Sequence, residues 1–319
     1  MKPLIVIIGP TAIGKSAVAV QLAEKIDGEI VSADSVQVYR ELNIGSAKIS
    51  EDEKRGIPHH LLDIVSIKEE FSVAQYQHLA ECAIGSIVAR GKIPILVGGS
   101  GLYVSSILFG YKFPQHESTG RLRQQLLQEH DQKGEAGLRE QLAAIDPAAV
   151  QKINRGDSRR LIRALEVYSL TGEKASLEMN QRLQRPTQKT VILGLYIERA
   201  QLYRNIELRV DAMMSRGLVN EVQQLLTDED CAFSKALLAV GYKEIIGYLK
   251  GEYTLEFAVQ LIKRNTRRFA KRQLTWFQRY QHAIWLPIDH MVGKGEVLAA
   301  LMEHCAPLYR QQTHQEEEV

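Results

Sequence analysis

The feature that most constrains the fold is a glycine-bearing segment close to the N-terminus. It fits the pattern G-x-x-x-x-G-K-[ST], whose backbone N–H groups surround phosphate oxygens while the lysine adds a positive charge and the hydroxyl can bind Mg²⁺. The apolar run Leu4–Ile8 before it is typical of a buried parallel strand, and apolar residues at helical spacing follow from residue 17 to 25. This order predicts an α/β unit. The loop consists of Gly9, Pro10, Thr11, Ala12, Ile13, Gly14, Lys15 and Ser16.

The rest of the chain contains further predicted strands, and one long segment without strands interrupts their series. Strands are predicted at residues 29–33, 93–97, 190–196 and 284–286, and helices from residue 72 and over 201–214, 219–226 and 255–277. Between residues 114 and 188 the strand signal disappears and the pattern becomes polar and helical. We therefore expect an α/β core of residues 1–113 and 189–312, a mainly helical insertion of residues 114–188, and a disordered acidic tail of residues 313–319.

Charge and cysteine content exclude several classes of protein. The net charge of this 319-residue chain is only +2, so its total charge does not call for an acidic partner. The 3 cysteines lie far apart without metal-ligand spacing, which argues against a disulfide framework and fits a reducing compartment. The apolar run Leu4–Ile8 is too short for a signal peptide or a membrane span. We expect a cytoplasmic protein with no membrane partner.

Asp34 follows the second predicted strand. Ligands of open α/β sheets bind at the carboxyl ends of the strands, so we expect Asp34 near Ser16, either as a general base or as a group that holds Mg²⁺ through water. The alternative is a turn cap, a frequent role of aspartate. The third predicted strand ends in Gly98-Gly99-Ser100 without the metal-binding aspartate of a nucleotide hydrolase. This pattern favours a transferase in which a carboxylate faces the phosphate site.

The long helix predicted near the C-terminus is strongly basic. From Phe257 to Ile288 the chain has no aspartate or glutamate, and its basic residues recur in pairs four apart, so they form one stripe. Aromatic residues follow, which is typical of nucleic-acid binding; the alternatives are a solvated face or arginines of the phosphate site. The stripe consists of Lys263, Arg264, Arg267, Arg268, Lys271 and Arg272, and a second basic group in the insertion consists of Arg155, Arg159, Arg160 and Arg163.

Two separated basic groups suit a long polyanion better than a small one. His59 and His60, which follow Pro58, have no third ligand at matching spacing, so a turn or hydrogen-bonding role is expected for them rather than metal or substrate contact.

Taken together, the motifs resemble those of the tRNA dimethylallyltransferase family. The matching stretches occur in the family's order across nearly the whole chain, which makes them far more specific than a phosphate loop alone. They are GPTAIGKS (9–16), SADSVQVYR (32–40), GIPHHLLDI (56–64), VGGSGLY (97–103), RRLIRALEVY (159–168), VGYKE (240–244) and TRRFAKRQLTWF (266–277).

The resemblance implies a P-loop NTPase-like parallel-sheet core and transfer of a dimethylallyl group from its diphosphate to N6 of adenosine 37 in tRNA. It implies that residues 9–16 bind the diphosphate with Mg²⁺, that Ser16 binds the metal, and that Asp34 accepts the N6 proton, with Lys15, Ser100 and Arg209 as further catalytic groups. Together with the basic helix, the expected tRNA contacts are Asp34, Ser35, Val36, Gln37, Ser100, Arg121, Arg159, Arg160, Leu161, Ile162, Arg163, Arg267 and Arg268.

The chain departs from the family's pattern at three positions. Ile13 replaces a serine of the loop, and Ser100 replaces a threonine but keeps the hydroxyl. Asn205 stands where the family has an arginine, which puts one of two diphosphate contacts in doubt, and Arg204 lies about 100° away around a helix. The zinc finger of eukaryotic members is absent, so the bacterial form is expected, acting as a monomer.

Three alternatives remain open. An adenylate isopentenyltransferase would modify a free nucleotide and would not need the basic helix or the arginines of the insertion. A P-loop small-molecule kinase would transfer phosphate from ATP. A non-catalytic RNA-binding protein would use the nucleotide as a switch and form no covalent product.

Overall fold

The computed structural model describes residues 3–111, 113, 120–176, 186, 189–232, 234–288 and 294–316. The chain forms two compact units, Met1–Leu108 with Pro186–Val319, and Phe109–Arg185. The second unit corresponds to the insertion, for which we expected residues 114–188. Each unit has a hydrophobic core of its own.

The first unit is built on a parallel sheet whose strand order is β3-β2-β4-β1-β5-β6. β1 lies between β4 and β5, and the register pairs Ile8 with Gly98 and Ala33 with Gly98. The phosphate loop and the Asp34 segment therefore leave the carboxyl edge of the sheet on either side of the end of β4. The strands are β1 (Pro3–Ile8), β2 (Gly28–Ala33), β3 (His59–His60), β4 (Ile93–Gly98), β5 (Lys189–Tyr196) and β6 (Ala283–Pro287).

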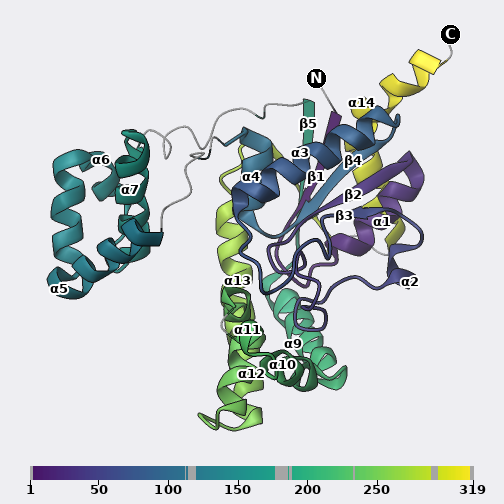
Figure 1. Cartoon of the computed structure of the whole chain (residues 1–319). Helices are drawn as coiled ribbons and strands as arrows, with labels where there is room; N and C mark the ends of the chain where they lie inside the picture. Colours follow the sequence, from purple (N-terminus) through teal and green to yellow (C-terminus); the bar gives the residue numbers. More distant parts are fainter. Residues whose placement is uncertain are drawn as a thin grey trace. The chain divides into compact units, whose positions relative to one another are not determined.

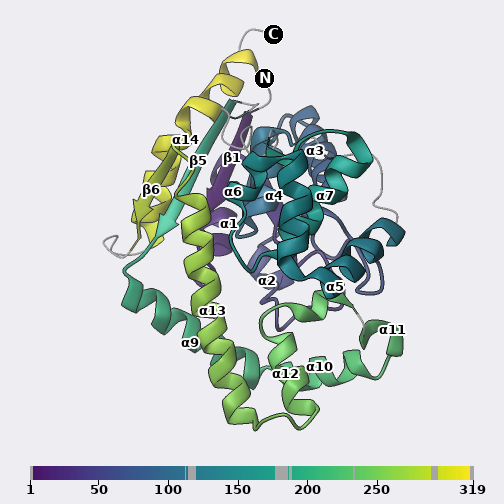
Figure 2. The same cartoon turned by 90° about the vertical axis from the view of Figure 1, so that its left-hand side faces the viewer.

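Helices cover both faces of the sheet (Figures 1 and 2). Helix α1 (Lys15–Ile26) and helix α14 (Lys294–Glu316) pack against each other and against the buried residues of one face. Helix α3 (Val73–Ala89) and helix α4 (Gly101–Phe109) lie on the other face. Ser72 caps α3 and Gln75 completes the capping box, as the sequence predicts.

A second helical cluster of the first unit lies beyond the carboxyl edge of the sheet (Figure 1). It has its own buried core, which includes Leu42, Val210, Val222, Tyr242 and Ile262. The long helix α13 belongs to this core at its start and contacts α4 near its end, where Trp276 Nε1 donates to Ser105 Oγ at 3.1 Å. The helices are α2 (Glu51–Lys54) in the loop before β3, and α9 (Arg199–Ser215), α10 (Leu218–Leu226), α11 (Glu229–Ala232), a 3₁₀ turn (Lys235–Leu238), α12 (Tyr242–Leu249) and α13 (Leu255–Phe277) in and around the cluster.

The described part of the second unit is helical, as predicted. Helix α5 (Gly120–Ile145) breaks at Gly134, where φ is 68°, a conformation that glycine adopts without strain. The fold back from there lets Leu138 and Leu142 pack on helix α7 (Ser158–Thr171), with helix α6 (Pro147–Lys152) beside them. Leu161 and Leu165 of α7 complete this core.

Three expectations need correction. Residues 313–316 continue helix α14, so the expected tail is helical in its described part, and residues 317–319 lie outside the described residues. His59 and His60 form an edge strand in place of the expected turn, and both make hydrogen bonds, the other role expected for them, His59 with the Ile57 carbonyl and His60 with Glu29. Helix α4 was not expected, because its sequence GLYVSSILF shows no polar face. Within the described ranges, no helix is both long and apolar enough to cross a membrane.

Candidate active site

The phosphate loop turns sharply between β1 and α1. Gly9 has a φ of 154°, and a Cβ there would lie 2.7 Å from the Leu195 carbonyl oxygen, so only glycine fits. Lys15 folds back across the loop and donates from Nζ to the Pro10 carbonyl at 2.8 Å. Burial, and then the nearby Arg209, lower the pKa of Lys15 to about 7, against the opposing attraction of Asp34. Burial thus disfavours the charged form of Lys15 in the free protein, and an anion bound in the loop would favour it.

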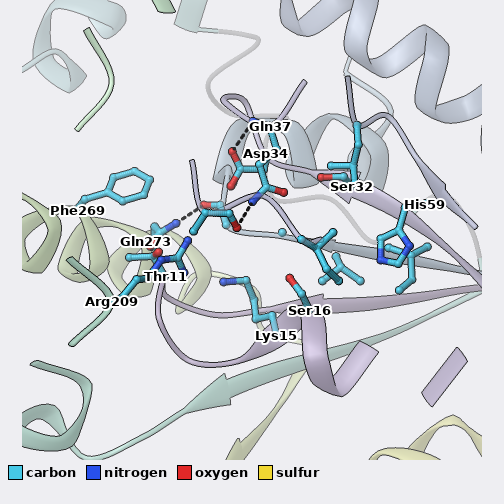
Figure 3. A pocket seen from close by; sticks show the side chains of 17 residues that line it. Thr11, Lys15, Ser16, Ser32, Asp34, Gln37, His59, Arg209, Phe269 and Gln273 are labelled. Carbon is cyan, nitrogen blue, oxygen red and sulfur yellow. Dashed lines mark hydrogen bonds between the residues drawn. The ribbon is translucent and has the colours of Figure 1, made fainter. Parts of the chain in front are cut away.

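Asp34 is both a turn cap and a cavity residue. Its Oδ1 accepts hydrogen bonds from the backbone N–H groups of Val36 at 2.8 Å and Gln37 at 3.3 Å. The same carboxylate lines the cavity over the phosphate loop, together with Lys15 and Ser16 (Figure 3). The turn cap, which the sequence offered as the alternative, is therefore present, and the turn fixes the orientation of a carboxylate that faces the cavity.

Ser100 ties the ends of β2 and β4 together. Its Oγ accepts from the Ser35 N–H at 2.9 Å and donates to Ser35 Oγ at 3.1 Å. A Cβ at Gly98 would lie 2.1 Å from the Ala33 carbonyl oxygen, so the glycine permits this close approach. Val36 and Gln37 are half-buried beside it, and Gln37 Nε2 donates to the carbonyls of Ser46 and Ala47.

Helix α9 supplies one arginine to the cavity. Arg209 lines it, and its Nη2 donates to the Ser46 carbonyl at 3.4 Å. Asn205, one turn earlier, donates to the Ala12 carbonyl at 3.5 Å and so contacts the phosphate loop itself. Arg204 is exposed and bonds Gln201, so it does not replace the arginine that the family has at position 205.

Gln273 of α13 is a residue that sequence reasoning missed. It is buried; its Oε1 accepts from the Thr11 N–H at 2.8 Å and its Nε2 donates to the Gly99 carbonyl at 3.0 Å. One side chain thus joins the phosphate loop, the end of β4 and the basic helix. The sequence did contain a sign of this role. Gln273 is spaced from Ala270 and Phe277 so that its amide lies on the apolar stripe of α13, where a polar side chain is unusual.

Two cavities meet at the Asp34 carboxylate. The one over the phosphate loop is small and polar, and its neighbour has a volume of about 540 Å³. They share Thr11, Asp34, Arg209 and Phe269. Apolar side chains contribute much of the larger lining, among them Val36, Phe71, Tyr103, Val210, Met213, Leu238, Val240 and Ile262.

The basic stripe of α13 has two different edges. Arg267 forms an ion pair with Glu207 at 2.8 Å, and Lys263 pairs with Asp211 at 2.6 Å, so acidic residues of α9 neutralise one edge. The absence of acids from Phe257 to Ile288 does not reveal these two partners, because they come from another helix. The other edge, which consists of Arg264, Arg268, Lys271 and Arg272, is exposed.

Three of the four arginines of the basic group in the second unit lie on α7, and Arg155 precedes that helix. Arg159, Arg160 and Arg163 are exposed, and so is Arg121 of α5. Arg160 pairs with Asp157 at 3.3 Å, and Arg163 lies 3.6 Å from the fully buried Glu166. Leu161 and Ile162, which are among the tRNA contacts expected from the sequence, are buried in the core of this unit, so their side chains are not available to a partner.

The fold and the cavities define a P-loop α/β protein in which the Asp34 carboxylate, at the end of β2, faces the phosphate site, whereas β4 ends in Gly98 and is followed by Gly99 and Ser100. The sequence profile of the IPP transferase family matches residues 37–280. This chain belongs to the IPP transferase family, which confirms the resemblance and the fold class predicted from the motifs.

Individual relatives agree with this assignment. The chain is 47% identical to a tRNA dimethylallyltransferase of Halothermothrix orenii, over 90% of this chain and 88% of that one, and 48% identical to one of Desulforudis audaxviator, over 91% and 94%. A solved tRNA isopentenylpyrophosphate transferase of Bacillus halodurans superposes with a TM-score of 0.73 at 38% identity, over 99% of this chain and 100% of that one. A eukaryotic dimethylallyltransferase acting on tRNA superposes with a TM-score of 0.78 at 30% identity, over 91% and 75%.

Proposed function

We propose that this chain transfers a dimethylallyl group from dimethylallyl diphosphate to N6 of adenosine 37, next to the anticodon of tRNA. The products are N6-(dimethylallyl)adenosine and diphosphate. The observation that carries the proposal is the position of Asp34 at the junction of a phosphate cavity and a larger, largely apolar one. The names of the relatives support the choice of both substrates.

The phosphate loop binds the diphosphate through its N–H groups, Lys15 and Arg209. Ser16 has its hydroxyl in the same cavity. The residues fit Mg²⁺, since that ion usually takes one or two protein ligands and completes its coordination with water and phosphate oxygens. No cluster of three or more His, Cys, Asp or Glu ligands occurs among the described residues, so the ion would depend on the diphosphate. Ser16 would hold Mg²⁺, which neutralises charge on the leaving group.

Asp34 acts as the general base. The exocyclic amine of adenine is a weak nucleophile, and it gains reactivity as its proton is removed. The bond from N6 to C1 of the prenyl group forms as the bond from C1 to the diphosphate oxygen breaks; the N6 proton passes to Asp34. Arg209 and Lys15 stabilise the negative charge that develops on the diphosphate.

The larger cavity receives the base and the prenyl chain. A stacked adenine must leave its stack before a protein group can reach N6, so base flipping is expected. Phe71, Tyr103 and Phe269 line this cavity and offer apolar and aromatic surfaces to the flipped base and the dimethylallyl group. Their surfaces also keep water away from the reacting carbon.

The exposed arginines serve the tRNA backbone. Arg268 on α13, and Arg160 and Arg163 on α7, are exposed cations of the kind that phosphate contacts require. An enzyme acting on tRNA works where tRNA is found, so we propose a cytoplasmic location. One chain carries all of these groups, and we propose that it acts as a monomer.

Mass analysis of adenosine 37 tests the function directly. Incubation of the protein with tRNA and dimethylallyl diphosphate should add one dimethylallyl group at that position. Lys15→Ala should abolish transfer yet leave tRNA binding nearly intact, because Lys15 lies in the phosphate cavity. A product on free AMP and none on tRNA, a phosphorylated product from ATP, or nucleotide-dependent tRNA binding without any product would each overturn the proposal.

A further inference from the structure

A buried nitrogen without a partner lies in the wall of the phosphate cavity. His59 on β3 lines that cavity together with Lys15 and Ser16. Its Nδ1 lies 2.8 Å from the Ile57 carbonyl oxygen, but its Nε2 has no hydrogen-bond partner among the described residues. Buried polar atoms nearly always have a partner, so an orphan beside a binding cavity points to a ligand.

The hydrogen bond to Ile57 determines what the free nitrogen can do. A carbonyl oxygen only accepts, so Nδ1 of His59 carries a hydrogen, and in the neutral ring Nε2 then presents a lone pair. Burial lowers the pKa of His59, which favours the neutral ring at neutral pH. The missing partner is therefore a donor. The oxygens of an ionised diphosphate only accept, so they do not fill this role.

The position of His59 narrows the choice of donor. In Figure 3 its ring lies on the side of the cavity where Ser16 and Ser32 lie, away from Arg209 and Phe269. Ser16 is the residue that would hold Mg²⁺, and an Mg²⁺ ion keeps several water molecules, each a strong donor. Successive side chains of a strand point to opposite faces of the sheet. The neighbouring His60 therefore points away from the cavity, and its Nε2 lies 2.7 Å from Glu29.

We propose that Nε2 of His59 accepts a hydrogen bond from a water molecule on the Mg²⁺ ion held by Ser16, and so positions that ion against the diphosphate. This inference rests on the proposed function. His59 is a positioning residue that acts through the hydrated ion. This role accounts for an imidazole in the cavity wall whose orientation is fixed by the hydrogen bond from Nδ1 to Ile57.

Calorimetric binding of inorganic pyrophosphate over a range of Mg²⁺ concentrations tests the proposal without turnover. His59→Leu should raise the Mg²⁺ concentration for half-maximal binding by about 10-fold or more, the usual effect of losing a partner of a metal ligand. Binding without Mg²⁺ should stay unchanged. His59→Gln, which keeps an acceptor at a similar reach, should be intermediate, and His60→Gln, the matched control, should leave the Mg²⁺ dependence unaltered.

An independent measurement uses the wild-type protein, so it stands even if His59→Leu does not fold. Imidazole ¹⁵N NMR should show the Nδ1–H tautomer, with the Nε2 resonance shifting only when pyrophosphate and Mg²⁺ are both present. Protonation of Nε2 on binding, equal losses with and without Mg²⁺, or the same loss in His60→Gln would overturn the inference. If the His59→Leu variant keeps the Mg²⁺ dependence of pyrophosphate binding, the inference is wrong but the proposed function stands. If the wild-type protein does not bind pyrophosphate at all, both the inference and the proposed function are wrong.

Discussion

Helices α13 and α7 both carry basic stripes, but they differ in what lies beneath them. Under the stripe of α13, Gln273 bonds the phosphate loop and the end of β4, and Trp276 bonds α4. Among the described residues, the arginines of α7 lie over Leu161, Ile162 and other core residues of their own unit, and Arg163 lies near the buried Glu166. The same surface pattern is therefore joined to the phosphate loop in one helix and to an independent core in the other.

The difference teaches that a basic stripe does not reveal its role by charge alone. On α13, residues of α9 neutralise one edge, and Gln273 on the buried face bonds the phosphate loop and the end of β4. We therefore expect substitutions on α13 to affect chemistry or binding according to the face, and substitutions on the outer face of α7 to affect binding alone.

The largest effect should come from Asp34→Asn, which lies outside both helices. Asparagine keeps the acceptor oxygen of the turn but cannot take the N6 proton. We expect kcat at saturating substrates to fall by about 10² to 10⁴. Single-turnover rates of this variant and of Arg160→Gln/Arg163→Gln, measured at saturating tRNA, sharpen the comparison. A slow chemical step in the α7 double variant would place that unit in the chemistry.

Gln273→Leu should be the most damaging single change on α13. It leaves the Thr11 N–H and the Gly99 carbonyl without their partner, at about 1–3 kcal/mol for each buried group. We expect a lower free energy of unfolding and weaker pyrophosphate binding, measured by urea denaturation and calorimetry. Thr275→Ala, an exposed position two residues away on the same helix, is the control. Equal effects in the two variants would show that the buried face of α13 does not stabilise the phosphate loop.

Pyrophosphate binding should weaken as the pH rises through 7. Lys15 has a pKa lowered to about 7 in the free protein, so it is charged below that pH and loses its charge above it, while a bound anion favours the charged form. For one coupled proton the affinity falls by at most about tenfold per pH unit. Calorimetry between pH 6 and 9, with the titration of pyrophosphate itself subtracted, measures the slope. Lys15→Arg should flatten the dependence of affinity on pH, because arginine keeps its charge over this range. An unchanged slope in that variant would show that another group takes up the proton.

The smallest effects should appear in the salt dependence of tRNA binding. Arg268→Gln should reduce the slope of log K against log salt by roughly 0.7 to 0.9 for each phosphate group that is no longer neutralised, equally for all substrate tRNAs. Arg160→Gln should do the same, and because the two arginines lie in separate units the double variant should be close to additive. Arg267, whose side chain is 29% exposed against 57% for Arg160 and which pairs with Glu207 at 2.8 Å, should change the slope less. Unchanged slopes for both exposed arginines would remove these helices from the tRNA interface.

Much of the fold could be predicted because it is encoded locally. The apolar run before Gly9, the capping box at Ser72 and the helical spacing of residues 255–277 depend on neighbours within a few residues. The observed helix has the predicted bounds, Leu255–Phe277. The short strand β3 and helix α4 were missed, since two residues carry no periodicity and a buried helix shows no polar face.

The sequence by itself determined the phosphate loop, the parallel sheet behind it and the presence of Asp34 at a strand end, because each follows from local pattern and from the rule that parallel strands end at one edge. Only the tertiary structure decided which groups meet there. Gln273 contacts Thr11 across 262 residues, and Arg267 meets Glu207 across 60. Likewise, only the tertiary structure shows that Nε2 of His59 has no partner among the described residues and that the ring lines the phosphate cavity. Such contacts depend on how distant elements pack, and no local periodicity encodes them.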